Sequence, residues 1–306
     1  MRIGLVGIGK IARDQHIPAL ASSSTFELAA CASRNASVAG IDCYPDLASM
    51  LAARPDLDCV GICTPPQAHF EGALLALRAG KHVLLEKPPT ATTRQIALLA
   101  EEAARLGRTL FQSWHSRFAA GVAAAREWLR GQEIAGGRIV WKEDVRVWHP
   151  GQRWIWEPGG FGVFDPGINA LSILTKILVE DVYVRQALLE YASNQQSPIA
   201  ADLLLQTEAG TRFPAEFDFR QTGEQMWVIE LATSRGTLQL SRGGAALAID
   251  GKGVAVDESI GEYPRLYEHF AALCAAGKSD VDWRPFQLVA DAMLVGERRL
   301  VEPFDM

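Results

Sequence analysis

The sequence lacks several features that would place it in other classes of protein. Its 306 residues contain no unbroken apolar run of the about 18 residues typical of a transmembrane helix. No cleavage-site pattern follows the apolar N-terminal stretch, so we expect no secretory signal peptide. Basic residues number 30 against 36 acidic residues, and the net charge of −6 argues against nucleic acid or an anionic membrane as a general partner.

Cysteine and histidine are scarce as well. The five cysteines are odd in number and follow no spacing pattern, which suits a reducing compartment, so we expect a cytoplasmic protein. Cys59 and Cys63 share one apolar strand and are interpreted as small core side chains. The six histidines show no paired ligand spacing, so no catalytic metal is expected.

The composition that remains is that of a folded protein with two domains. Hydrophobic residues make up 48 % and charged residues 22 % of the chain, which is ordinary globular usage. A chain of 306 residues exceeds what one core usually organises. We expect an α/β protein with a dinucleotide-binding domain at 1–118 and a substrate-binding α+β domain at 119–306.

The first domain opens with a strand that leads into a glycine-rich turn. The predicted strand at 2–7, RIGLVG, is apolar after Arg2 and runs into GIGKIA at 7–12, which matches G-x-G-x-x-G/A. In such a turn Gly7 allows the tight bend, Gly9 lets the backbone approach a pyrophosphate, and a helix N-terminus faces the phosphates. The alternative interpretation is an ordinary glycine-containing turn without a ligand. The strand directly before the motif favours the dinucleotide-binding interpretation.

The second strand, at 26–32, ends in Ser33 and Arg34 without a nearby carboxylate. A site that prefers NAD usually places Asp or Glu here to bind the ribose 2′-hydroxyl, whereas arginine accommodates a 2′-phosphate. The pattern predicts NADP as the preferred cofactor, with NAD second. Arg34 as a solvated loop charge is the alternative.

Further strands and helices alternate along the first domain. A strand at 59–63 ends in a Thr-Pro-Pro turn, helices are predicted at 68–79 and 93–106, and a strand is predicted at 109–112. Short connections of this kind predict a parallel sheet with helices on both faces. Between the two helices, GKHVLLEKPP puts Lys87 at the carboxyl end of a strand, where open α/β sheets bind ligands. On its own, Lys87 would be interpreted as a surface lysine in a loop, and the motifs upstream of it reverse that preference.

The second domain is predicted to contain a largely antiparallel, open-faced sheet, because its apolar residues recur every second position. A helix at 122–130 precedes the sheet and helices at 263–276 and 285–299 follow it. The predicted strands span 137–147, 181–191, 201–207, 212–219, 226–233, 237–241 and 246–249.

Polar residues in apolar stretches of this domain are candidates for a substrate pocket. Asp165 precedes Pro166 and is predicted to be a helix N-cap, with Asn169 one turn further on the same side. Glu143 is predicted on the apolar face of a strand, where an unpaired carboxylate is costly. His115 is a weaker candidate, because a lone histidine is more often satisfied locally.

Tryptophan is concentrated close to these residues. Four of the eight tryptophans fall within 141–156, and Trp227 lies in a later strand. An indole ring has a flat apolar face that can cover the C–H face of a sugar, although core packing is the alternative for each ring.

The order of the first-domain motifs resembles the Gfo/Idh/MocA oxidoreductase family. These motifs are the G-x-G-x-x-A turn, the Thr-Pro-Pro turn and AGKHVLLEKP, in that spacing. The run 141–173 is similar to the bacterial dehydrogenases of that family that oxidise L-arabinose and D-galactose at carbon 1. The resemblance implies NAD(P)-dependent oxidation of an aldopyranose (L-arabinose, D-galactose or D-fucose) to its aldonolactone, in carbohydrate catabolism.

The resemblance also implies roles for individual residues. Lys87 and Asp165 are the implied catalytic pair. The implied substrate contacts are His115, Glu143, Trp148, Asn169 and Trp227. The implied cofactor contacts are Gly7, Gly9, Lys10, Ile11, Ser33, Arg34, Thr64, Pro65, His69, Glu86 and Lys87. Many family members carry histidine where this chain has Asn169, so proton transfer would fall to Lys87, Asp165 or both.

Two other interpretations stay open at this stage. One is a different reaction of the same family, such as oxidation of an inositol or of a broad range of aldoses. The other is a dinucleotide-binding regulator that has lost turnover. The family also implies that the last helix packs back on the first domain, and an uncovered sheet face favours a homo-oligomer, a dimer or tetramer.

Overall fold

The computed structural model describes residues 1–305, and the chain divides into two compact units. The first unit comprises Met1–Trp114 together with Tyr263–Trp283, and the second comprises His115–Glu262 and the chain from Arg284 onward. The boundary predicted at 118 falls at Trp114, and a short segment near the C-terminus belongs to the first unit.

The first unit is built on a six-stranded sheet of order β3-β2-β1-β4-β5-β6. Every pair in it is parallel. The strands are β1 (Arg2–Val6), β2 (Glu27–Ala32), β3 (Cys43–Tyr44), β4 (Cys59–Ile62), β5 (His82–Leu85) and β6 (Leu110–Gln112). The central strands β4 and β5 carry almost only buried side chains, as strands covered on both faces do.

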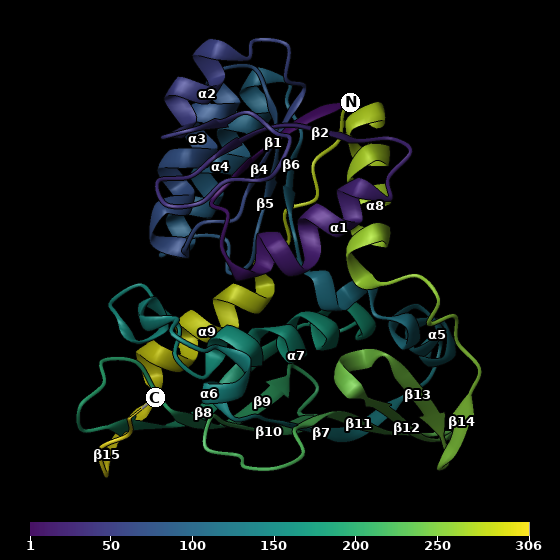
Figure 1. Ribbon diagram of the computed structural model, residues 1–306. Helices are drawn as coiled ribbons and strands as arrows, with labels where there is room; N and C mark the ends of the chain where they lie inside the picture. Colours follow the sequence, from purple (N-terminus) through teal and green to yellow (C-terminus); the bar gives the residue numbers. More distant parts are fainter. Residues whose placement is uncertain (306) are drawn as a thin grey trace. The chain divides into compact units, whose positions relative to one another are not determined.

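Helices cover both faces of this sheet, with α2, α3 and α4 on one side and α1 and α8 on the other (Figure 1). The helical elements are η1 (Ala12–His16), α1 (Ile17–Ala21), α2 (Leu47–Ala53), η2 (Pro66–Ala68), α3 (His69–Arg78), α4 (Thr93–Leu106) and α8 (Glu262–Ala276). Thr92 and Gln95 form a capping box at the start of α4, and Gly107 ends that helix in the left-handed region, with φ of 62°.

The second unit contains a nine-stranded sheet of order β14-β13-β12-β11-β7-β10-β9-β8-β15. Its strands are β7 (Ile134–Lys142), β8 (Val182–Ala192), β9 (Ala200–Thr207), β10 (Arg212–Asp218), β11 (Met226–Thr233), β12 (Gly236–Ser241), β13 (Ala246–Ile249), β14 (Lys252–Val254) and β15 (Glu297–Val301). The pairs β7–β10 and β8–β15 are parallel and the others are antiparallel. The predicted α/β class with a largely antiparallel second sheet is confirmed.

One face of the nine-stranded sheet is covered by helices (Figure 1). They are η3 (His115–Phe118), α5 (Ala120–Leu129), α6 (Val145–Trp148), η4 (Arg153–Trp156), α7 (Phe164–Ile177), η5 (Arg242–Gly244) and α9 (Arg284–Val295). Helix α7 lies directly on β10, because a Cβ atom at Gly167 would come within 2.7 Å of the Phe217 ring. Along β10 buried and exposed residues alternate, so the opposite face is uncovered.

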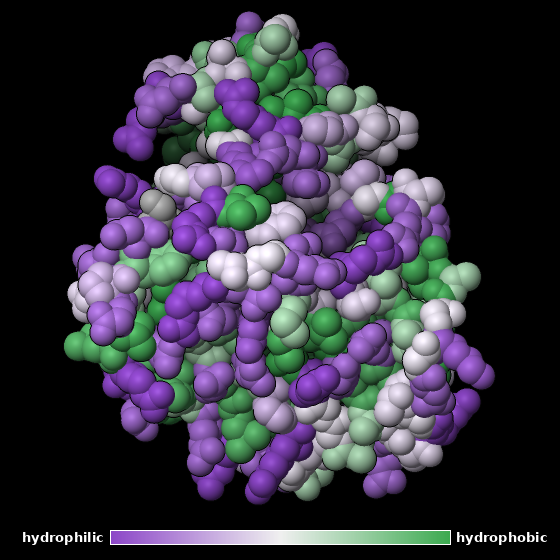
Figure 2. All heavy atoms as spheres, turned by 60° about the horizontal axis from the view of Figure 1, so that its bottom comes forward, coloured by the Kyte–Doolittle hydropathy of each residue, from purple (hydrophilic) through white to green (hydrophobic). Residues whose placement is uncertain are grey.

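The uncovered face mixes charged and apolar side chains. Lys142 of β7 bonds Glu216 of β10 at 2.6 Å, and Arg138 bonds Glu230 of β11 at the same distance. Figure 2 looks toward this side of the second unit and shows hydrophobic patches among hydrophilic side chains.

The last two helices belong to different units. Helix α9 contacts α7 and β8 of the second unit, whereas α8 lies almost entirely in the first. That the last helix also packs back on the first domain stays a prediction. Helix α8 joins the first unit through its apolar stripe, whose buried Phe270 stacks on Phe26 and Phe111 at centroid distances of 5.6 and 6.0 Å.

Three predicted element boundaries in the second unit also need correction. The strand predicted to reach residue 147 ends at Lys142, because Asp144 accepts a hydrogen bond from the Arg146 amide and begins α6. The last helix ends at Val295 rather than 299, and the residues that follow form β15. Asp165 is not an N-cap, because α7 already begins at Phe164.

The cysteines are in two states. Cys31 and Cys43 are register partners on β2 and β3, and a disulfide joins them, with Cα atoms 4.5 Å apart. The absence of a cysteine pattern did not predict this bond. Cys59, Cys63 and Cys274 are free. Among the described residues no helix is both long and apolar enough to cross a membrane.

Candidate active site

The carboxyl ends of the parallel strands in the first unit carry most of the predicted cofactor residues. Each strand end is bonded to its neighbour: the amide of Gly7 donates to Ala32 O, Cys63 to Val6 O, and Glu86 to Ile62 O, at 2.8 to 3.0 Å. The loops that follow these strands therefore begin at one edge of the sheet, where open α/β sheets bind nucleotides.

The glycine turn after β1 has the backbone that a dinucleotide site needs. Gly7 has φ of +87°, and a Cβ atom there would lie 2.9 Å from the backbone of Cys63 and Thr64. Gly9 is exposed, and a Cβ atom on it would meet nothing within 4 Å. The turn is therefore packed closely against the protein at Gly7 and open at Gly9, which fits the approach of a pyrophosphate.

The loop after β4 offers a buried polar atom without a partner. Thr64 Oγ1 has no hydrogen-bond partner within the described chain, and neither has Ser113 Oγ at the end of β6. Buried hydroxyls are normally bonded, so both atoms suit a bound ligand. Pro65 beside Thr64 is exposed.

His69, predicted as a cofactor contact, is fully buried and lies between two loops. Its Nδ1 is 3.1 Å from Pro89 O and its Nε2 is 2.5 Å from Thr64 O. Burial lowers the pKa of this ring, so it is uncharged near neutral pH, and the two carbonyl contacts offset part of that effect. His69 thus ties the Thr64 loop to the Lys87 loop.

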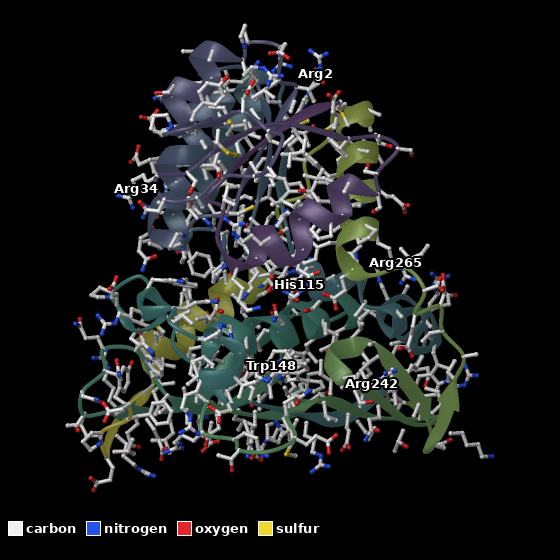
Figure 3. All side chains as sticks on the ribbon, viewed as in Figure 1. Arg2, Arg34, His115, Trp148, Arg242 and Arg265 are labelled. Carbon is white, nitrogen blue, oxygen red and sulfur yellow. A yellow bond between two sulfur atoms is a disulfide. The ribbon has the colours of Figure 1, made fainter. Side chains whose placement is uncertain are left out.

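The loop after β2 is exposed. Arg34 lies at the periphery of the first unit (Figure 3), and no acidic residue occurs between Ala32 and Ile41. Lys10 is exposed at the glycine turn, where it pairs with Asp14, while Ile11 is half-buried. Ser33 donates its amide to Tyr44 O at 2.9 Å, which fixes the start of the loop on β3.

In the second unit the structure brings several predicted substrate residues together around a histidine. Glu143 is 2 % exposed; its Oε1 is 2.9 Å from His149 Nε2, and its Oε2 accepts a hydrogen bond from Trp227 Nε1 at 2.8 Å. On the other side of the ring, His149 Nδ1 is 3.6 Å from Asp165 Oδ2. Asp165 is 3 % exposed. An imidazole therefore stands between two buried carboxylates.

His149 was not singled out from the sequence. It lies six positions after Glu143 and sixteen before Asp165, so no short-range spacing links the three. Only the strand end at Lys142 and the short helix α6 bring the ring back over Glu143. The available signal was its position directly after Trp148, inside the tryptophan-rich run 141–156.

Aromatic rings surround this cluster. Trp148 meets Trp227 edge-on at a centroid distance of 4.8 Å, and Trp227 stacks on Trp141 at 6.0 Å. Trp148 is 39 % exposed, so one ring of the group faces solvent. Exposed indole beside buried carboxylates is a surface that suits a ligand with hydroxyls and an apolar face.

The remaining two candidates lie elsewhere in the second unit. His115 Nδ1 is 2.5 Å from Glu262 Oε2, so this ring is held by a carboxylate outside the Glu143 group. Figure 3 shows His115 and Trp148 on the helix-covered side of the sheet. Asn169 lies one helical turn after Asp165 on α7, as the spacing of the two residues predicted. Its side chain is half-buried.

Comparison with known proteins decides the family. The model of the Gfo/Idh/MocA oxidoreductases, described as an oxidoreductase family with an NAD-binding Rossmann fold, matches residues 1–113. Galactose 1-dehydrogenase of Pseudomonas fluorescens is 45 % identical over 304 residues, covering 99 % of this chain and 98 % of that protein. This chain belongs to the Gfo/Idh/MocA family. It is thus an oxidoreductase with an NAD-binding Rossmann domain, as predicted.

Solved structures of relatives agree with the family fold. A crystal structure of D-galactose-1-dehydrogenase from Rhizobium etli superposes with a TM-score of 0.94 at 49 % identity, covering 99 % of this chain and 97 % of that one. A 3-ketoreductase from Actinomadura kijaniata, crystallised with NADP, gives a TM-score of 0.86 at 22 % identity, over 98 % of this chain and 99 % of that one. At that identity the second likeness shows the fold alone.

The glycine turn generates a test of cofactor binding that needs no substrate. In Gly9→Ala the added methyl group meets no protein atom, so the melting temperature should stay within about 1 °C of the wild-type value. The affinity for NADP should fall about tenfold or more, because the methyl group occupies the space through which the pyrophosphate approaches the backbone. Quenching of tryptophan fluorescence measures the affinity. Gly253→Ala on β14, equally open, is the control and should change neither quantity. Unchanged affinity in Gly9→Ala would place the pyrophosphate elsewhere.

Proposed function

We propose that the protein is an NADP-preferring aldopyranose 1-dehydrogenase that oxidises D-galactose and L-arabinose, and also D-fucose, to aldonolactones. The observation that carries this proposal is the Glu143–His149–Asp165 group with its tryptophans. Buried carboxylates that face an exposed indole suit a ring rich in hydroxyls. The similarity to galactose 1-dehydrogenases over almost the whole chain supports it.

The proposed reaction removes two hydrogens from the anomeric carbon and its hydroxyl. The bound nicotinamide supplies the hydride acceptor for the hydrogen on carbon 1. The hydroxyl proton passes to Lys87 and Asp165, and the carbon–oxygen bond becomes the carbonyl of the lactone. Asn169 can only donate and accept hydrogen bonds, so it orients the substrate and takes no proton.

We assign His149 to this machinery through its contact with Asp165. A protonated imidazole would donate to Glu143 through Nε2 at 2.9 Å and would pair by charge with Asp165, whose Oδ2 is 3.6 Å from Nδ1, which makes it a place to hold the proton after it leaves the sugar. Glu143 has lone pairs beyond those that His149 and Trp227 occupy, so it can accept a substrate hydroxyl. His149 thus provides the imidazole that position 169 lacks.

The remaining features of the proposal concern partners and place. The partner is a small-molecule aldose. The uncovered face of the nine-stranded sheet, with its mixed charges and apolar patches, suits association of two copies, so we propose a homo-oligomer. Three of the five cysteines are free and two form the Cys31–Cys43 disulfide, and we propose a cytoplasmic location because the cysteines lack the spacing pattern of a disulfide-rich secreted protein.

Cofactor preference is testable through Arg34. The loop after β2 lacks a carboxylate, so catalytic efficiency with NADP should exceed that with NAD by about tenfold, the size of one charge-assisted contact of about 1.4 kcal/mol. Arg34→Asp should reverse or abolish the gap, because the carboxylate repels the 2′-phosphate and accepts from a 2′-hydroxyl. Initial rates with both cofactors measure this. Equal efficiencies in the wild type would refute the preference.

The roles of Lys87 and Asp165 are testable by charge-removing variants. Lys87→Met and Asp165→Asn should each lower kcat by roughly two to four powers of ten, because each loses its proton-transfer group, while NADP affinity stays within a few-fold. Steady-state rates and cofactor titrations measure the two effects. Lys278→Met and Asp181→Asn, both exposed, are matched controls that should behave as wild type. Turnover preserved in either test variant would assign that residue a structural role.

Substrate specificity is the test of the proposed function itself. D-galactose and L-arabinose share an axial hydroxyl at carbon 4, whereas D-glucose and D-xylose carry it equatorially. A pocket that bonds the axial hydroxyl leaves buried polar groups unpaired with the epimers, so kcat/KM for D-galactose should exceed that for D-glucose by about a hundredfold or more. Absorbance of reduced NADP measures both rates. A ratio near one would indicate a broad aldose dehydrogenase, and no rate with any sugar would indicate a regulator.

A further inference from the structure

Glu86, the residue before the proposed catalytic lysine, is held in the interior of the first unit by hydrogen bonds from three protein groups. Its side chain is 2 % exposed. Oε2 accepts a hydrogen bond from the Lys87 amide at 2.7 Å. Oε1 accepts one from the Tyr263 hydroxyl at 2.7 Å and lies 3.0 Å from His16 Nε2. Both carboxylate oxygens are thus engaged within the fold.

A carboxylate in this position is expensive unless each of its oxygens is bonded. Removing one partner of a buried charge costs several kcal/mol, and replacing Glu86 by an apolar residue would leave three donors unpaired. An apolar side chain after β5 would fill the same space without the cost of burying a charge. The Glu86 carboxylate therefore has a role besides packing. Its bond to the Lys87 main chain shows what it holds.

The groups behind Glu86 are themselves fixed. His16 Nδ1 is 2.8 Å from the Tyr267 hydroxyl, and the His16 ring meets Tyr263 edge-on at a centroid distance of 4.8 Å. Burial alone would lower the pKa of His16, but Cys63, Tyr267 and Glu86 together raise it well above its usual value. The ring therefore donates to Glu86 near neutral pH.

The loop that carries Lys87 is held at its other end as well. His69 Nδ1 lies 3.1 Å from Pro89 O, on the far side of Lys87 from Glu86. The Lys87 main chain is consequently fixed from residue 86 and from residue 89, while its own side chain is only half-buried. This arrangement directs the lysine through its main chain.

We propose that Glu86 is a positioning residue that fixes the main chain of Lys87 for proton transfer, and that Tyr263 and His16 hold the Glu86 carboxylate in place. The inference rests on the proposed catalytic role of Lys87. It replaces the expectation that Glu86 contacts the cofactor. Tyr263 and Tyr267 come from α8, so a segment 177 residues from Glu86 completes the lysine loop.

The test uses Tyr263→Phe and Glu86→Gln in the full-length protein. Both should lower kcat for D-galactose about ten- to a hundredfold, because small misplacement of a reacting group costs about that much. The Kd for NADP, from fluorescence titration, should stay within about threefold. Tyr267→Phe, one bond further away, should have a smaller effect on kcat. Glu101→Gln, an exposed carboxylate of α4, is the control and should match wild type.

A second measurement does not depend on turnover. Without substrate, the hydrogen of the Lys87 amide should exchange with deuterium more quickly in Glu86→Gln than in wild type. The rate at which acetic anhydride acetylates Lys87, measured by mass spectrometry, should also differ between the two proteins. Amides on β1 should keep their protection, which shows that the sheet is intact. This measurement stands even if the wild type oxidises no sugar, a result that would refute the proposed function alone.

Two results would overturn the positioning role. One is wild-type kcat in both Tyr263→Phe and Glu86→Gln. The other is a Kd for NADP that rises by the same factor as kcat/KM falls, which would make Glu86 a cofactor contact. If Glu86→Gln fails to fold, Tyr263→Phe decides alone, because it removes one hydroxyl and keeps the ring.

Discussion

A carboxylate taken out of water must be bonded by the protein, and this constraint organises both units of the molecule. Glu86 in the first unit and Glu143 in the second are each 2 % exposed. Each is bonded by a histidine and by a second aromatic side chain, Tyr263 in one case and Trp227 in the other. Because such bonds are lost at a cost of several kcal/mol, they define the local geometry more strictly than apolar contacts do.

The two carboxylates nevertheless have different surroundings, and the difference separates their roles. Glu86 is bonded by groups in the interior of the first unit, and one of its oxygens accepts from a backbone amide. Glu143 belongs to a group that includes the partly exposed Trp148 and a second carboxylate, Asp165, across the His149 ring. The first arrangement stabilises a loop, and we propose that the second presents polar groups to a ligand.

Much of this arrangement could be predicted from the sequence, and the rest could not for identifiable reasons. The glycine turn, the strand that ends just before Glu86 and the parallel sheet follow from local patterns that span few residues. His149 and Tyr263 escaped prediction because their partners are distant in sequence: six and sixteen residues for His149, and 177 for Tyr263. Strand β15 escaped because Gly296 breaks an otherwise helical pattern only at its end. The spacing of apolar residues shows which face of a helix or strand is buried. Which other helix or strand covers that face depends on the topology of the whole fold.

The division of the chain bears on how the protein acquires its structure during synthesis. The family model covers residues 1–113, but the described first unit also contains Tyr263–Trp283, whose Phe270 stacks on Phe26 and Phe111. A ribosome releases the N-terminal sheet long before it makes that segment. The sheet must therefore wait, with one aromatic surface uncovered, until almost the whole second unit has been translated. We expect chaperones to bind the nascent chain at this uncovered aromatic surface. The same division means that an exchange of nucleotide-binding domains between relatives must transfer two segments, Met1–Trp114 and Tyr263–Trp283.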